Sequence, residues 1–193
     1  MESIAVIDFE TTGVSPTQAR ATEIGVAIIE DGRIVDRYQS LMNSGAWVPP
    51  FIEQLTGISN AMLRKAPPSD QVMNEVADFI GERPLLAHNA AFDQKFWDAE
   101  LGLLGRRRAR DFACSLLLSR RLLPEAPSHK LGNLNAWAGL PDTGRAHRAL
   151  ADAEMAANLT LHLFSLLRER HGRQPGQGKP RKSAEDQEQL PRG

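Results

Sequence analysis

The sequence predicts an α/β fold in which a mixed five-stranded sheet is flanked by helices. Val/Ile-rich runs of strand length come first along the chain, and two of them are separated by a two-residue turn signal. Apolar residues at helical spacing follow, and short apolar runs then alternate with further helical patterns. Strands that first pair by hairpins and later alternate with helices produce a mixed sheet.

The first three strands are expected at Ile4–Phe9, Glu23–Glu30 and Arg33–Leu41. Asp31-Gly32 supplies the turn between the second and third, because glycine tolerates the positive φ that tight hairpin turns require. Since the connections are short, we expect an antiparallel meander.

The period changes after Pro67-Pro68, where apolar residues recur at i, i+4, i+7 and i+8 and predict one helix face: Val72, Val76, Phe79 and Ile80. The later elements are expected as a strand at Leu85–Ala87, a helix over about Ala90–Leu104 capped by Asn89, a strand at Arg110–Ala113, and helices at Ser115–Leu123, Lys130–Ala138 and about Leu150–Arg168.

Composition divides the chain into a folded domain, residues 1–171, and a disordered tail, residues 172–193. The tail is rich in Gly, Pro, Gln and charge, with little to bury. The formal net charge of −1 argues against a passive nucleic-acid coat protein. A domain without a basic excess that handles a polyanion would need bound cations to reverse the local field.

Other classes are excluded by what the sequence lacks. No apolar run approaches the roughly 20 residues of a membrane span, and the N-terminus carries no signal-peptide pattern. The single cysteine, Cys114, cannot form an intramolecular disulfide and fits a small core residue better than a nucleophile. We therefore expect a cytoplasmic protein with no membrane partner.

Two carboxylates stand at the end of the first predicted strand, in the segment DFETTG. Residues two apart in an extended chain point to the same face, so Asp8 and Glu10 lie side by side at the strand end. Two anions this close repel each other unless a cation bridges them. The alternative for this motif alone is a polar strand end that enters a turn.

Two further motifs place acids at helix starts. In HNAAFD, Asp93 falls in a first helical turn, where the helix dipole favours a carboxylate even without a function. In HRALADA, His147 and Asp152 are five residues apart, so we expect His147 in a loop that leans over a site entered by Asp152. Together the three motifs supply four carboxylates and one titratable base. Hard oxygen ligands of this kind suit Mg²⁺ or Mn²⁺.

With these motifs the sequence closely resembles the DEDDh, or DnaQ-like, family of 3′-to-5′ exonucleases, and among them the epsilon-type proofreading exonucleases of bacterial DNA polymerase III. The resemblance runs from about Ile4 to Leu167 and includes the connecting segments IEQLTGISN and HKLGNLNAW. It implies an RNase H-like sheet and release of nucleoside 5′-monophosphates from DNA 3′ ends during proofreading or repair.

The resemblance also implies roles for the five motif residues. Asp8 would be shared between two divalent metal ions, with Glu10 and Asp152 on the ion that holds the attacking water. Asp93 would bind the second ion, and His147 would be the general base. A histidine of ordinary pKa, near 6.5, accepts a proton around neutral pH.

Seven residues are candidates for contact with a single-stranded or frayed 3′ end. Thr11 and Thr12 offer N–H and hydroxyl groups beside the acids, and apolar side chains can stack on or wedge between terminal bases. Core packing is the alternative for the apolar members. The candidates are Thr11, Thr12, Leu55, Ile58, His88, Asn89 and Phe92.

Three other interpretations stay open. An RNA-trimming exonuclease of the same family fits the same motifs, because the metal site contacts phosphates and not the sugar. A module that grips strand ends without cutting would be expected to lose an acid or the histidine, and all five residues are present. The third is a subunit that works when docked on a DNA polymerase, with the tail as a tether.

Overall fold

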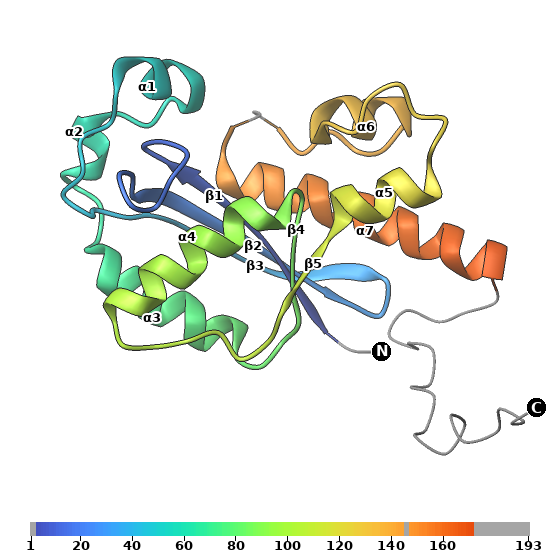
Figure 1. The fold of residues 1–193 in the computed structure, drawn as a ribbon, viewed down its shortest axis with the longest axis horizontal. Coiled ribbons are helices and arrows are strands. Elements are labelled where there is room, and N and C mark those ends of the chain that lie inside the picture. The colour runs from blue at the N-terminus through green and yellow to red at the C-terminus, as the bar shows by residue number, and fades with distance from the viewer. Residues whose placement is uncertain (1–2, 145–146, 172–193) are drawn as a thin grey trace, which may run out of the picture.

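The computed structural model describes residues 3–144 and 147–171, and the predicted tail, residues 172–193, lies outside them. Five strands form one sheet: β1 (Ile4–Thr11), β2 (Ala21–Glu30), β3 (Arg33–Leu41), β4 (Leu85–Ala87) and β5 (Phe112–Cys114). The helices are α1 (Pro50–Thr56), α2 (Asn60–Leu63), α3 (Ser69–Ile80), α4 (Ala90–Leu103), α5 (Ser115–Leu122), α6 (Leu131–Trp137) and α7 (Ala149–His171). Figure 1 labels each element.

The sheet is mixed, with the strand order β3-β2-β1-β4-β5. β1 pairs antiparallel with β2, and β2 pairs antiparallel with β3. β4 pairs parallel with β1, and β5 pairs parallel with β4. The predicted α/β fold with a mixed five-stranded sheet is confirmed, including the antiparallel meander of the first three strands.

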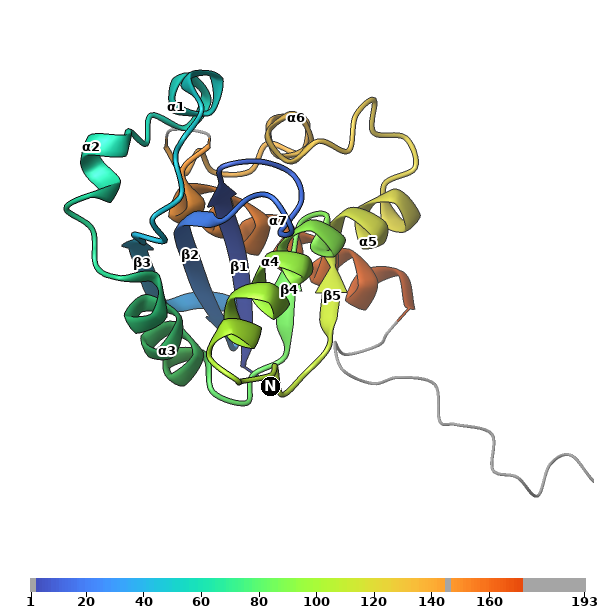
Figure 2. The ribbon, with the colours of Figure 1, turned by 60° about the vertical axis from the view of Figure 1, so that its left-hand side comes forward.

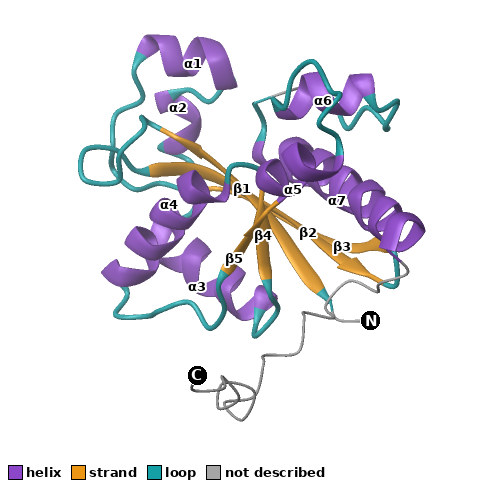
Figure 3. Cartoon of the chain, turned by 45° about the vertical axis from the view of Figure 1, so that its right-hand side comes forward, coloured by secondary structure: helices purple, strands orange, loops and turns teal. Residues whose placement is uncertain are grey.

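Helices cover both faces of the sheet. Figures 2 and 3 show α3 and α4 on one side and α7 on the other. Alternate residues of β1 point to opposite faces. Ile7 belongs to the core cluster that contains residues of α3 and α4, whereas Val6 belongs to the cluster that contains residues of α7. By this alternation Asp8 and Glu10 face α7.

Most element boundaries agree with the sequence prediction to within a few residues. The hairpin turn is present, with φ of 48° at Asp31 and 79° at Gly32. Asn89 occupies the N-cap position of α4 but adopts a left-handed conformation, φ 67°, and its side chain makes no capping hydrogen bond. The predicted capping role of Asn89 is therefore wrong.

The helices α1 and α2 were not predicted. They span seven and four residues, too few to repeat an apolar helical pattern. Pro50 at the start of α1 has the φ that a first helical turn needs, and Gly57 ends the helix in a left-handed conformation. Among the described residues, no helix is both long and apolar enough to span a membrane.

Candidate active site

The carboxyl end of β1 carries the first two acids of the site. Asp8 and Glu10 both lie on the face toward α7, as the alternation of the strand requires. Opposite them on β2 stand Gly25, in register with Asp8, and Glu23, in register with Glu10. The ladder shifts between Glu10 and Thr11, so regular pairing is interrupted directly after the acids.

The third acid, Asp93, comes from the first turn of α4 on the other side of β1. Its side chain is buried, and its Oδ1 accepts a hydrogen bond of 3.1 Å from the main-chain N–H of Phe9. Phe9 stands between Asp8 and Glu10, so this bond fixes α4 against the strand segment that carries both acids.

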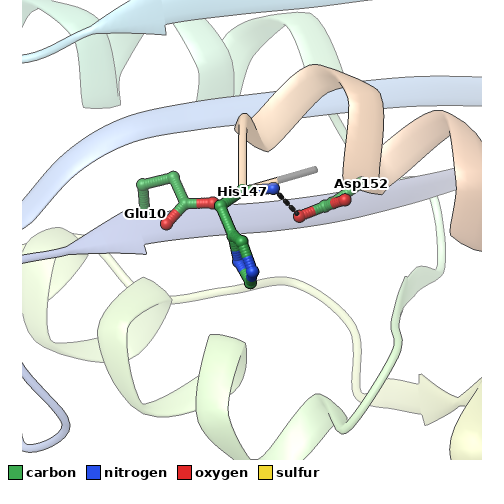
Figure 4. A group of neighbouring side chains, drawn as sticks. All are labelled: Glu10, His147 and Asp152. Atoms are coloured by element: carbon green, nitrogen blue, oxygen red, sulfur yellow. Dashed lines mark hydrogen bonds between the residues drawn. The ribbon is translucent and has the colours of Figure 1, made fainter. Parts of the chain in front are cut away.

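His147 and Asp152 come from the start of α7. His147 precedes the helix with φ 61°, and its main-chain N–H donates a 3.0 Å hydrogen bond to Oδ2 of Asp152. Figure 4 shows the imidazole ring pointing away from this bond. One possible ligand atom from each of Glu10, His147 and Asp152 lies within 4.8 Å of the others, so these three side chains can hold one metal ion.

Burial raises the pKa of all four carboxylates, and repulsion from other acids of the site adds to the shift of Asp8 and Glu10. Burial, followed by repulsion from Asp152 and other acids, raises the pKa of Glu10 from 4.5 to about 8. Burial raises the pKa of Asp93 from 3.8 to about 7, although the Phe9 N–H opposes this shift. The pKa of Asp8 is raised well above its usual value by burial and then by Asp93 and Asp152. Burial also raises the pKa of Asp152.

This donor set fits divalent metal ions. Desolvation and repulsion between carboxylates disfavour the ionised form of these acids. A cation that lies between them favours the ionised form again. Four carboxylates with one imidazole at the edge supply mainly hard oxygen ligands, which suit Mg²⁺ or Mn²⁺.

A cleft of about 560 Å³ opens over these acids. Besides the five motif residues, its lining includes Thr11, Leu55, His88, Asn89 and Phe92 from the predicted set. It also includes residues that the sequence analysis missed: Phe9, Gly13, Val14, Phe51, Ile52 and Thr56. The exposed side chains of Phe51 and Leu55 make one wall apolar. They lie one helical turn apart on α1, a signal that is visible only once α1 is known to be a helix.

Two of the predicted contact residues do not line the cleft. Ile58 is fully buried with Val48, Ile52 and Leu63, so its predicted contact with a base is corrected to core packing. The hydroxyl of Thr12 accepts a hydrogen bond from the N–H of Arg20, and the Thr12 N–H donates to the Arg20 carbonyl. Thr12 therefore closes the loop between β1 and β2, and its contact with the strand end stays a prediction.

His88 lines the cleft with both ring nitrogens engaged. Nε2 lies 2.9 Å from the carbonyl oxygen of His129, so it must donate, and Nδ1 then accepts from the hydroxyl of Ser115 at 3.0 Å. Burial lowers the pKa of His88. The residue joins the end of β4 to α5 and to the loop before α6, and it has no ring nitrogen left for a strand end.

Four arginines that follow α4 form a basic cluster, and none of them lines the cleft: Arg106, Arg107, Arg108 and Arg110. Arg106 pairs with Asp78, and Arg108 pairs with Asp98 and Asp111. The cluster precedes β5, at the opposite end of the parallel strands from Asp93. Arg106 and Arg108 therefore form surface ion pairs beyond the end of α4.

A mixed sheet of this order, with four carboxylates and a histidine at the carboxyl end of its central strand, defines an RNase H-like nuclease fold. The chain belongs to the Exonuclease (RNase_T) family, whose sequence profile matches residues 5–160. The resemblance to DEDDh 3′-to-5′ exonucleases predicted from the three motifs is confirmed.

Two relatives illustrate the range of proteins that carry this domain. The chain is 35% identical over 173 residues to the 3′-5′ exonuclease DinG of Bacillus subtilis, covering 87% of this chain and 18% of that protein. It is 28% identical over 171 residues to the DNA polymerase III subunit epsilon of Aquifex aeolicus, covering 88% and 84%. The chain spans less than a fifth of the length of DinG and of the PolC-type polymerases that it matches.

Solved structures agree with the fold. Exonuclease X in complex with 5′ overhanging duplex DNA matches with a TM-score of 0.71 and 25% identity, covering 84% of this chain and 91% of that chain. The nuclease domain of 3′hExo, a DEDDh family member bound to rAMP, matches with a TM-score of 0.73 at 22% identity. It covers 85% of this chain and 92% of that domain.

Proposed function

We propose that this protein removes nucleotides one at a time from the 3′ end of a DNA strand and releases nucleoside 5′-monophosphates. The observation that carries the proposal is the convergence of Asp8, Glu10, Asp93, Asp152 and His147 on one cleft with an apolar wall. The names of the relatives, a DinG exonuclease, PolC-type polymerases and an epsilon subunit, favour DNA and a role in proofreading or repair.

The four carboxylates would hold two divalent ions, Mg²⁺ or Mn²⁺. Asp8 would be shared between them, Glu10 and Asp152 would hold one, and Asp93 would hold the other. When bound, such ions stabilise the negative charge on the attacking and leaving oxygens of a phosphoryl displacement. The raised pKa values of Glu10 and Asp93 support this assignment, because a nearby cation offsets the cost of ionising them.

His147 would accept the proton of the attacking water. Its ring is exposed at the cleft and within reach of the same position as the carboxylates of Glu10 and Asp152. The hydrogen bond from its main-chain N–H to Asp152 holds the residue while leaving the ring free. Water would then add to the phosphorus as the bond to the 3′ oxygen of the preceding nucleotide breaks. That oxygen would take a proton from solvent and become the new 3′-hydroxyl, and the terminal nucleotide would leave as its 5′-monophosphate.

The apolar wall would hold the terminal bases. Leu55 is 48% exposed and Phe51 is 67% exposed, so both offer free surface at the cleft. Phe92 lines the cleft beside Asp93. Apolar and aromatic surfaces accept any base, because every base has an apolar face. Unpaired ends enter more easily than paired ends, since no base pair has to be broken.

The test is digestion of 5′-labelled single-stranded DNA and matched RNA in Mg²⁺, Mn²⁺ or EDTA, with a circular single strand as a control for internal cutting. We expect a descending ladder on DNA that disappears with EDTA and in Asp8→Ala, and no cutting of the circle. Thin-layer chromatography of internally labelled DNA should show nucleoside 5′-monophosphates.

Other outcomes lead to different conclusions. Faster shortening of RNA than of DNA would contradict the DNA assignment and indicate an RNA-trimming enzyme. No shortening of either strand, with tight binding retained, would overturn the catalytic proposal and leave a module that binds strand ends.

A further inference from the structure

A fifth acid, Glu23, lies beside the four carboxylates but is fully buried on β2. Its Oε1 accepts from Nη2 of Arg148 at 2.7 Å and from Nε2 of Gln39 at 2.8 Å. Its Oε2 accepts from Nε of Arg148 and from the main-chain N–H of Ala149, both at 3.0 Å. These four hydrogen bonds occupy both oxygens, so Glu23 is poorly suited to hold a metal ion.

The partners of Glu23 are the residues that begin α7. Arg148 directly follows His147, and Ala149 is the first residue of the helix. The N–H of Ala149 has no partner inside the helix, because the first N–H groups of any helix point out of its end. Glu23, on β2, therefore caps the N-terminal end of α7. The guanidinium of Arg148, the residue before Ala149, binds the same carboxylate.

The register of the sheet places the contact between Glu23 and the start of α7 beside the acids of the site. Glu23 stands opposite Glu10, and Gly25 stands opposite Asp8. A Cβ built on Gly25 would lie 2.2 Å from the carbonyl carbon of Ala149, so the start of α7 lies directly on β2 at this glycine. β2 therefore holds the first turn of α7 next to the positions of β1 that carry Asp8 and Glu10.

We propose that Glu23 and Arg148 are positioning residues that set the distance of His147 and Asp152 from Glu10, and thereby the affinity of the site for divalent metal ions. The inference rests on the proposed metal-dependent function. A carboxylate paired in two hydrogen bonds with a guanidinium has a defined orientation as well as a charge interaction, which a lysine would not reproduce.

A second buried ion pair in the same fold provides a matched control. Glu100 of α4 accepts from Nε and Nη2 of Arg20 at 2.8 Å each and from the main-chain N–H of Ala21 at 3.2 Å. Arg20 and Arg148 are equally exposed, at 31%, and both acids are almost completely buried. These hydrogen bonds of Glu100 involve no residue of α7.

The experiment measures Mn²⁺ binding to the full chain by titration calorimetry, together with the melting temperature in EDTA. We expect Glu23→Gln and Arg148→Lys each to weaken Mn²⁺ binding about 10–100-fold, the usual effect of losing a group that orients metal ligands. Glu100→Gln should lower the melting temperature but leave Mn²⁺ affinity within about twofold of the wild type.

Arg148→Lys separates positioning from charge. The lysine keeps a cation beside Glu23 and loses only the paired hydrogen bonds of the guanidinium, so weakened Mn²⁺ binding in this variant supports positioning. Should Glu23→Gln fail to fold, Arg148→Lys carries the same expectation. Wild-type Mn²⁺ affinity in Arg148→Lys, or equal weakening in Glu100→Gln, overturns the inference. A wild-type protein that binds no Mn²⁺ overturns the proposed metal site itself, and with it the inference.

Discussion

The main-chain N–H of Phe9 donates a hydrogen bond to the carboxylate of Asp93, which lies 84 residues further along the chain. This contact joins the first motif to the second. Because Phe9 lies between Asp8 and Glu10, the bond sets the position of the third acid relative to the first two. The site is therefore built on the main chain of the central strand as well as on its side chains.

Asp93→Asn should separate the metal site from the fold. An amide oxygen can still accept from the Phe9 N–H, but the negative charge is lost. We expect kcat to fall about a hundredfold or more. Stability of the EDTA-treated protein at pH 8 should rise on the order of 1 kcal/mol, because a buried carboxylate whose pKa is raised to about 7 no longer ionises. Urea unfolding measures this gain. The control is Asp98→Asn, on the same helix, with activity retained; equal loss of activity in both variants would contradict the assignment of Asp93.

Removal of metal should make stability depend on pH. Glu10 has a folded-state pKa of about 8, above its ordinary 4.5, so its protonation stabilises the folded state below pH 4.5. This stabilisation is lost as pH rises from 4.5 through 8. In EDTA the melting temperature should fall as the pH rises from 5 to 9. Saturating Mg²⁺ should raise the melting temperature more at pH 8.5 than at pH 6. Parallel curves with and without Mg²⁺ would argue against carboxylate ligands.

His147→Asn should remove the proton acceptor with little effect on the fold. Asparagine tolerates the left-handed conformation that His147 adopts, φ 61°. We expect kcat to fall about 10²–10⁴-fold, while the free energy of unfolding changes by less than about 0.5 kcal/mol. Single-turnover digestion and urea unfolding measure the two quantities. Near-normal kcat would mean that another group accepts the proton.

The apolar residues Leu55 and Ile58 should respond in opposite ways to truncation. Leu55→Ala removes exposed surface from the cleft wall and should raise KM for single-stranded DNA about tenfold with little change in stability. Ile58→Ala leaves a cavity in a fully buried cluster and should cost about 2–5 kcal/mol of stability with KM nearly unchanged. If Ile58→Ala raised KM as Leu55→Ala does, the assignment of Ile58 to the core would be incomplete.

Gly25→Ala should damage the site through α7. The added methyl group would overlap the main chain of Ala149, so the helix start must move away from β2. We expect a loss of about 1–3 kcal/mol of stability and a fall in activity of more than about tenfold. Gly102→Ala is the control, because a Cβ there, near the C-terminal end of α4, meets nothing within 4 Å. If Gly25→Ala lowered stability and activity no more than Gly102→Ala does, the start of α7 would be able to shift away from β2 at no measurable cost.

Local patterns in the chain were enough to predict the sheet, most helices and the motif residues. The alternation of β1 placed Asp8 and Glu10 on one face, and the hydrophobic spacing of α3 predicted its buried side. Side-chain period and turn residues are local properties, so they can be read without knowing what packs against them. The family followed from the three motifs for the same reason, because each motif is a short continuous segment.

Contacts between distant segments decided the rest. Only the tertiary structure brings Glu23 to Arg148, 125 residues further along the chain, and only it removes Ile58 from the cleft while adding Phe51. The sequence does not distinguish an acid that lines a site from one that supports it. The same holds for an apolar residue in or next to a short helix. Burial and hydrogen-bond partners distinguish the two, and both arise when the sheet and α7 pack together.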